Sequence, residues 1–155
     1  MASPIGFDPT HYTSTIAGSF VQGMKYTDSA TGYEYRYAKN TTDGAITQGM
    51  SCVMASTSAF LVTYSNGASQ LSLYAGAGIC TLSTVATSLY FFMLVNGIYP
   101  FALDASNGVT NGSFVTGKNV NGNFINGVAA QVNKEIGYAL ANASGGVFPI
   151  RVTIG

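Results

Sequence analysis

The sequence predicts an all-β protein: a small β-barrel or sandwich-like domain with an extended N-terminal arm. Short apolar segments recur at intervals of roughly 8 to 12 residues with Gly, Asn, Asp or Ser between them, as in barrels and sandwiches. Residues 33–39 (YEYRYAK) alternate strictly between two faces, which is the pattern of a half-buried strand. Helix signals are scarce, because only residues 128–134 (VAAQVNK) could form two turns and glycines lie close on both sides.

Residues 1–18 are expected to form the arm. They show neither the two-residue period of a strand nor the 3.6-residue period of a helix, and their prolines favour extended or turn conformations. A disordered tail is usually poor in aromatic groups, so we expect this arm to dock on its own domain or on a neighbour. The residues we expect to make these contacts are Ile5, Phe7, His11 and Tyr12.

Residues 19–155 are expected to form a single β domain. Further strands are predicted at 19–27, 50–55, 60–64, 70–74 and 79–82. Near the end of the chain, residues 135–141 and 147–154 flank a Gly-rich turn and predict a terminal hairpin. Residues 105–133 form a loop-rich Asn/Gly section, with four Asn-Gly pairs between short apolar pieces.

The most apolar stretch, residues 89–104, predicts a central hairpin. Residues 89–95 (LYFFMLV) do not alternate at all, so we expect that strand to be covered on both faces. Asn96-Gly97 suits a type I′ turn, in which both central residues have positive φ. Pro100 has no amide hydrogen to donate, which places the second strand at an edge or a bulge near this residue and makes it the better candidate for a subunit contact.

Composition excludes several classes of partner. Charged residues make up 8% of the chain and the formal net charge is zero, which argues against nucleic acid and against an anionic membrane surface. Low charge fits a surface covered in an assembly and equally a surface rich in Ser, Thr and Asn. We expect no secretory signal and no spanning segment, and we favour buried thiols over a disulfide for Cys52 and Cys80.

Patterns that carry catalysis or bind metal are missing from the sequence. His11 is the only histidine, and an arm is a poor frame for a general base. The six acidic residues form no convincing pair, and no metal-ligand or phosphate-loop spacing occurs. We therefore expect a protein that is not an enzyme and holds no cofactor or metal. The ten tyrosines suit either an adaptable binding surface or a β core with hydroxyls at its rim.

Several short motifs resemble a known family. Residues 33–39 (YEYRYAK) are followed by 44–49 (GAITQG) leading into an apolar strand. Residues 136–152 (IGYALANASGGVFPIRV) form the terminal motif, and 89–98 match the family's aromatic-rich central strand loosely. Together these stretches look like the small head-decoration, or capsid cement, proteins of tailed bacteriophages. The similarity runs from about residue 33 to the C-terminus.

The resemblance implies a function as well as a fold. It implies a β-barrel-like domain on the outer surface of a phage head, often a homotrimer, that contacts the major capsid protein and stabilises the assembled shell. Such a protein is made in the host cytoplasm and ends in the virion. The alternative from another class is a phage tail or fibre module that binds a host receptor or glycan, for which the tyrosines and the Asn-Gly loops are the features in the sequence.

Overall fold

The computed structural model describes residues 9, 13–14, 20–42, 44–56, 60–64, 75–117, 121–128 and 135–154. Within these residues the protein is all β and has no helix, as predicted. The strand expected at 70–74 and nearly all of the possible helix at 128–134 lie outside the described residues.

The strands, in chain order, are β1 (Thr13–Ser14), β2 (Lys25–Thr27), β3 (Glu34–Asn40), β4 (Ile46–Thr47), β5 (Ser51–Ser56), β6 (Leu61–Tyr64), β7 (Gly76–Ile79), β8 (Thr84–Val85), β9 (Tyr90–Leu103), β10 (Phe114–Gly117), β11 (Phe124–Asn126), β12 (Gly137–Ala139) and β13 (Val147–Thr153). Of the strand predicted at 19–27, only the last part forms, as β2. The strand predicted at 79–82 is wrong except for Ile79, because β7 runs through the preceding glycines from Gly76 to Ile79. The strands predicted at 33–39, 50–55 and 60–64 appear as β3, β5 and β6 with modest changes of boundary.

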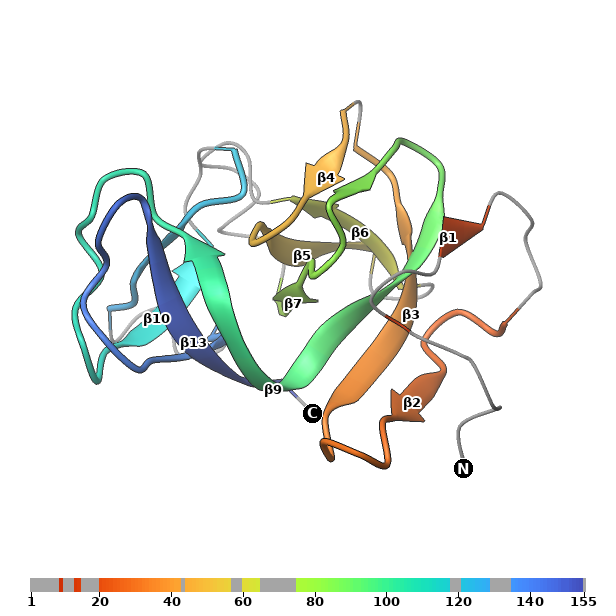
Figure 1. Cartoon of the computed structure of the whole chain (residues 1–155). Coiled ribbons are helices and arrows are strands. Elements are labelled where there is room, and N and C mark those ends of the chain that lie inside the picture. The colour runs from red at the N-terminus through yellow and green to blue at the C-terminus, as the bar shows by residue number, and fades with distance from the viewer. Residues whose placement is uncertain are drawn as a thin grey trace.

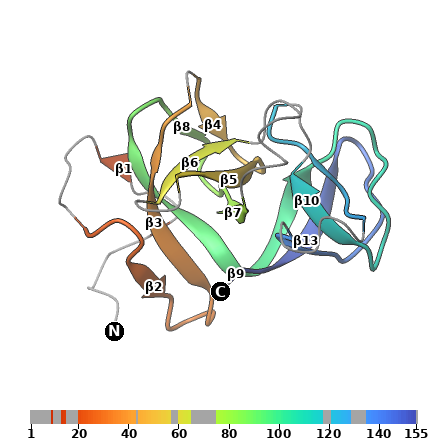
Figure 2. The same ribbon diagram turned by 180° about the vertical axis from the view of Figure 1, so that it is seen from behind.

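Five strands close into a barrel, in the order β9-β7-β5-β6-β3 and back to β9 (Figures 1 and 2). All neighbours are antiparallel except β3 and β6, which pair in parallel through Lys39 and Asn40. Closure pairs strands that would otherwise be edges of the sheet. The predicted barrel is therefore confirmed.

The predicted central hairpin is wrong, because residues 90–103 form one continuous strand. The first half of β9 pairs with β3, ending at Glu34 opposite Asn96, and the second half pairs with β13, beginning at Thr153 opposite Asn96. Asn96 does not have the positive φ that a type I′ turn requires, and Gly97 has φ +148°. β9 therefore bends at the Asn-Gly pair and changes partners there. Figure 1 shows β9 as the long green ribbon that runs from the barrel strands to β13.

The expected irregularity near Pro100 is confirmed. The register between β9 and β13 shifts between Phe148, opposite Ala102, and Ile150, opposite Tyr99. Two residues of β9, Pro100 and Phe101, thus lie opposite one residue of β13, and both are exposed. This bulge accommodates the missing amide hydrogen of the proline.

The second half of β9 carries a lobe made of β13, β12, β10 and β11. The predicted terminal hairpin is β12 and β13, paired from Gly137 with Val152 to Ala139 with Ile150. Hydrogen bonds join this lobe to the barrel. The Leu103 amide donates to the Gly49 carbonyl (3.0 Å), and the Ser51 amide and hydroxyl both donate to the Gly122 carbonyl (2.7 and 3.0 Å).

The first half of β9 is buried on both sides, which explains its lack of alternation. Phe91, Met93 and Val95 belong to the core cluster that also holds Cys52 and Cys80.

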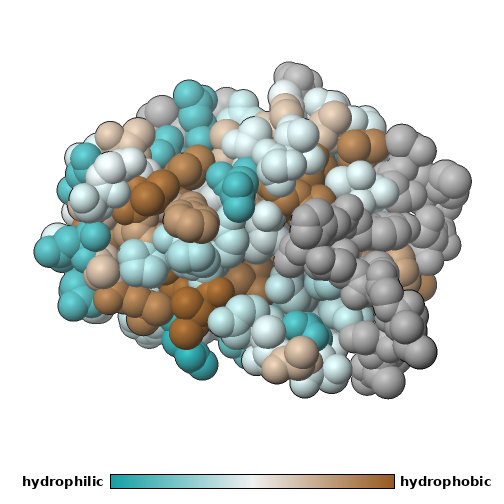
Figure 3. All heavy atoms as spheres, viewed as in Figure 1, coloured by the Kyte–Doolittle hydropathy of each residue, from teal (hydrophilic) through white to brown (hydrophobic). Residues whose placement is uncertain are grey.

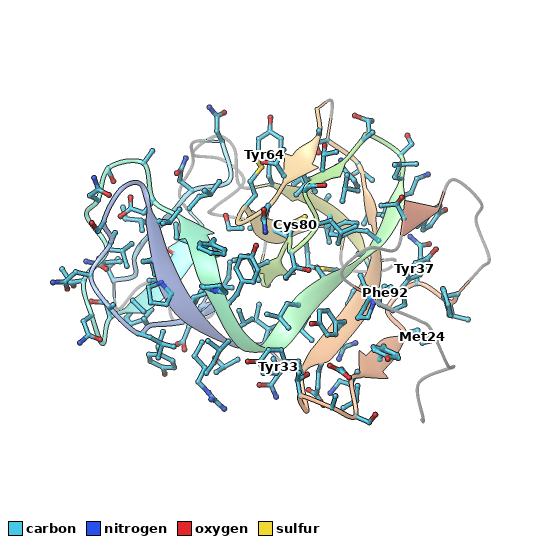
Figure 4. The ribbon with its side chains drawn as sticks, in the orientation of Figure 1. Met24, Tyr33, Tyr37, Tyr64, Cys80 and Phe92 are labelled. Carbon is cyan, nitrogen blue, oxygen red and sulfur yellow. The ribbon has the colours of Figure 1, made fainter. Side chains whose placement is uncertain are left out.

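The intervening side chains Tyr90, Phe92 and Leu94 belong to a second cluster on the other side of the strand. There the Phe92 ring lies 4.9 Å from Tyr37 and 5.3 Å from Phe20, centroid to centroid (Figure 4). Burying a side chain of this size contributes about 2 kcal/mol to folding. β9 is therefore the strand shared by the two cores of the molecule.

Candidate functional site

The arm residues expected to make contacts, Ile5, Phe7, His11 and Tyr12, lie outside the described residues. Next to them, β1 pairs with the start of β9, with Thr13 opposite Phe91. This part of the arm is therefore bound to its own domain.

The lobe beyond the bend presents an apolar sheet face to solvent. Tyr138, Arg151 and Ile98 lie directly opposite one another on β12, β13 and β9, so their side chains share one face. Three of its apolar side chains have exposed fractions of 41–44%, and these are Ile98, Tyr138 and Leu140. Figure 3 shows apolar side chains at the surface over β13 and the second half of β9. We call this surface the outer sheet face.

The chemistry of the outer sheet face is that of a protein interface. Large aromatic side chains and arginine are the groups enriched at interface centres, and Tyr138 and Arg151 supply them here. A hydrogen bond and the negative charge of Glu135 raise the pKa of the Tyr138 hydroxyl. The same strands bury Tyr99, Ala139 and Ile150 on their other side, so the outward apolar groups are not needed to form the core.

A pocket of about 560 Å³ lies where β9 bends. It is lined from five separate parts of the chain, by Thr13, Tyr33, Tyr35, Gln48, Thr81, Leu82, Ser83, Thr84, Leu94, Ile98 and Tyr99. Tyr35, Leu82, Leu94 and Tyr99 are buried, whereas Gln48, Ser83 and Thr84 are exposed at its rim. Figure 4 places Tyr33 beside the bend of β9.

Among the described residues that line the pocket, none carries a charge. The nearest candidate by sequence, Glu34, is engaged elsewhere: its Oε2 atom accepts from Lys25 Nζ at 3.1 Å and from the Asn96 side chain at 3.4 Å. Burial raises the pKa of the Tyr99 hydroxyl, and the Gln48 side chain lowers it by a smaller amount. The geometry between these two groups falls short of a hydrogen bond. The described part of the lining is therefore uncharged.

Within the described ranges, no three His, Cys, Asp or Glu side chains gather as metal ligands. The buried Asp104 carboxylate accepts hydrogen bonds from the amides of Ser106 (3.1 Å) and Val109 (2.7 Å), which gives it a structural role in the turn after β9. Cys52 and Cys80 are free and buried, as the favoured reading of the sequence expected.

Reasoning from the sequence identified only part of these surfaces. The second half of β9, with Pro100, was predicted as a contact edge, and its exposed residues now form part of the outer sheet face. Tyr138 and Arg151 were seen only as parts of a terminal hairpin, although their alternate spacing from buried neighbours marks them as outward-facing. No signal along the chain pointed to the pocket.

No family model matches the chain, and no curated protein matches it significantly. The fold alone therefore defines the class of this protein, which is an all-β protein built on a closed five-stranded barrel. No helix in the described part of the chain has the length and apolar character needed to cross a membrane.

Proposed function

We propose that this protein is a structural protein of a bacteriophage virion that binds the outside of the assembled head and stabilises it. Its partner is the major capsid protein, and its working form is a homotrimer. The observation that carries the proposal is the outer sheet face, in which Ile98, Tyr138 and Leu140 are exposed beside Arg151. The motifs that resemble capsid cement proteins indicate which partner this face meets.

The outer sheet face suits a permanent contact with a large, regular partner. A rigid sheet loses little conformational entropy on docking, which reduces one of the costs that oppose binding. Exposed apolar groups of this kind mark interaction surfaces when they are contiguous. The low overall charge of the chain, 8% charged residues, suits a protein packed densely among neighbours on a shell.

Stabilisation of the head follows from mass action. A protein that binds only the assembled lattice stabilises it by RT ln(1 + [L]/Kd), about 2.7 kcal/mol per site when its free concentration is a hundred times Kd. A trimer that engages neighbouring capsid subunits adds avidity without a new kind of contact. Weak binding at each individual site would therefore suffice to stabilise the head.

The test is reconstitution on expanded heads that lack the protein. We expect the purified chain to sediment with the heads and to raise their melting temperature. We expect Tyr138→Ala to weaken binding about tenfold or more, because truncating a central aromatic residue at an interface costs over about 1–2 kcal/mol. Tyr33→Ala, which alters the pocket and leaves the outer sheet face intact, is the matched control. Heads that melt identically with and without the protein would refute the stabilising function.

The competing assignment is a tail or fibre module that binds a host receptor or glycan. The two functions differ in copy number, because a head lattice offers a site to every group of capsid subunits whereas a tail offers few. Quantitative mass spectrometry of purified particles separates them. Hundreds of copies per particle support decoration of the head, and a handful would assign the protein to the tail.

A further inference from the structure

The pocket at the bend of β9 has the size of a small-molecule site. Its volume of about 560 Å³ falls within the range of about 300–1,000 Å³ that such sites occupy. It lies on the barrel side of the bend, and of the residues in the outer sheet face only Ile98 also lines it. The pocket is therefore a second feature, with its own chemistry.

Charge excludes whole classes of ligand. A phosphate, a carboxylate or a nucleotide needs a cation or an array of donors, and the lining, as far as the structure describes it, offers no Lys, Arg or His. A metal ion needs carboxylate, imidazole or thiolate ligands, which the lining also lacks. The ligand that fits is electrically neutral.

The lining mixes apolar faces with uncharged hydrogen-bonding groups. Three tyrosines and three aliphatic residues supply the apolar surface, namely Tyr33, Tyr35, Tyr99, Leu82, Leu94 and Ile98. At the rim, Gln48 offers an amide and Ser83 and Thr84 offer hydroxyls, each able both to donate and to accept. A purely hydrocarbon ligand would take these groups out of water without partners, at a cost.

We propose that this pocket is a binding site for a neutral saccharide. A pyranose ring has an apolar C–H face, which stacks on a tyrosine ring, and a rim of hydroxyls, which pair with amide and hydroxyl groups. Tyr33 and Tyr99 provide the stacking surface, and Gln48, Ser83 and Thr84 bind the sugar hydroxyls. The inference goes beyond attachment to the head and does not depend on where in a particle the protein lies.

The expected affinity of a single sugar ring is weak. Ligand efficiencies typical of small ligands correspond, for a hexose, to a dissociation constant on the order of a few millimolar. Losing one net hydrogen bond weakens binding about 3- to 10-fold, which is the effect expected for Gln48→Ala. Filling the pocket with Ser83→Trp should abolish binding, and because Ser83 is exposed the substitution leaves the core untouched.

Saturation-transfer difference NMR on the full chain tests the proposal. The probes are glucose, galactose, mannose and N-acetylglucosamine. Glucuronic acid serves as a charged comparison, and an uncharged tetrapeptide of Val and Thr with blocked ends serves as a peptide comparison. Ser144→Trp, at an exposed serine in the turn between β12 and β13, is the matched control for Ser83→Trp. Circular dichroism of each variant confirms that it is folded.

The proposal expects saturable binding of at least one neutral sugar, retained in Ser144→Trp and lost in Ser83→Trp. Absence of saturable binding by all four neutral sugars would overturn it, as would sugar binding that survives Ser83→Trp. Binding of the tetrapeptide alone would assign the pocket to a peptide and would also overturn it. Tyr138→Ala, which alters the outer sheet face, should leave sugar binding unchanged. A failure of the sugar-binding proposal can therefore be told apart from a failure of head binding.

Discussion

Replacing Gly97 with alanine should destabilise the protein strongly, because this residue lies where β9 passes from the barrel into the second lobe. Its φ of +148° is a conformation that residues with a side chain rarely adopt. An added Cβ would also lie 2.7 Å from Cγ of the Tyr33 ring, well inside van der Waals contact. Two separate costs therefore combine at one position.

The magnitude follows from these two costs. The backbone conformation costs about 1–2 kcal/mol for a residue with a Cβ, and the overlap costs about 1–3 kcal/mol as the ring shifts. A total near 3 kcal/mol is a large part of the 5–15 kcal/mol that stabilises a typical domain. For a chain of this length it lowers the melting temperature by about 6–12 °C.

Chemical denaturation of wild type, Gly97→Ala and Gly145→Ala measures the effect. Gly145 has φ +62° with nothing within 4 Å of an added Cβ. Alanine there should therefore cost only the free energy of the unfavourable backbone conformation, about 1–2 kcal/mol. In a Tyr33→Ala background the extra cost of Gly97→Ala should disappear, leaving a coupling energy of about 1–3 kcal/mol. Equal costs at the two glycines, or no coupling to Tyr33, would refute the continuous strand.

Two further predictions concern buried groups. The pKa of Asp104 is lowered in the folded protein, because desolvation, which raises it, is outweighed by hydrogen bonds from Ser106, Val109 and the neighbouring backbone. Its stabilising contribution is therefore present above the unfolded pKa near 4 and lost as the pH falls through the lower folded value. Asp104→Asn should cost about 2–4 kcal/mol at pH 7 and flatten the acid limb of a stability–pH profile, and an unchanged limb would contradict this. Burial raises the pKa of Cys52 and raises that of Cys80 to about 12, so a thiol reagent such as iodoacetamide should label them only as fast as the protein unfolds, and rapid labelling of the native protein would be the contrary result.

The strands that could be predicted are those whose local pattern agrees with their long-range pairing. Residues 34–40 alternate and do form β3, and the Gly-rich turn before Val147 does join β12 to β13. The unbroken apolar run before Asn96 indicated a strand covered on both faces, and the two core clusters on either side of β9 account for it.

The central hairpin could not be excluded from the sequence, because its local signal is a genuine one. Asn-Gly forms a tight turn elsewhere in this chain: Asn121 and Gly122 both have positive φ, between β10 and β11. At Asn96-Gly97 the pairing of Asn96 with both Glu34 and Thr153 stabilises the extended form instead. The choice depends on partners more than 50 residues away, which no local pattern records.

The pocket was beyond prediction for a similar reason. Tyr33 directly precedes β3 and Tyr99 lies on β9, and these two strands meet because the barrel closes between them. Gln48 and Ser83 come from the short β4–β8 sheet region, which pairs residues nearly 40 positions apart. A site assembled from single residues of separate segments leaves no motif in the sequence.

A cryo-electron microscopy map of the intact particle tests the central claim most directly. Decoration of the head predicts density for this fold on the outer surface of the shell, with β9, β13 and β12 turned toward the major capsid protein and Tyr138 buried in the contact. Density for the protein on the tail would contradict the claim, and so would density on the head with the outer sheet face turned to solvent.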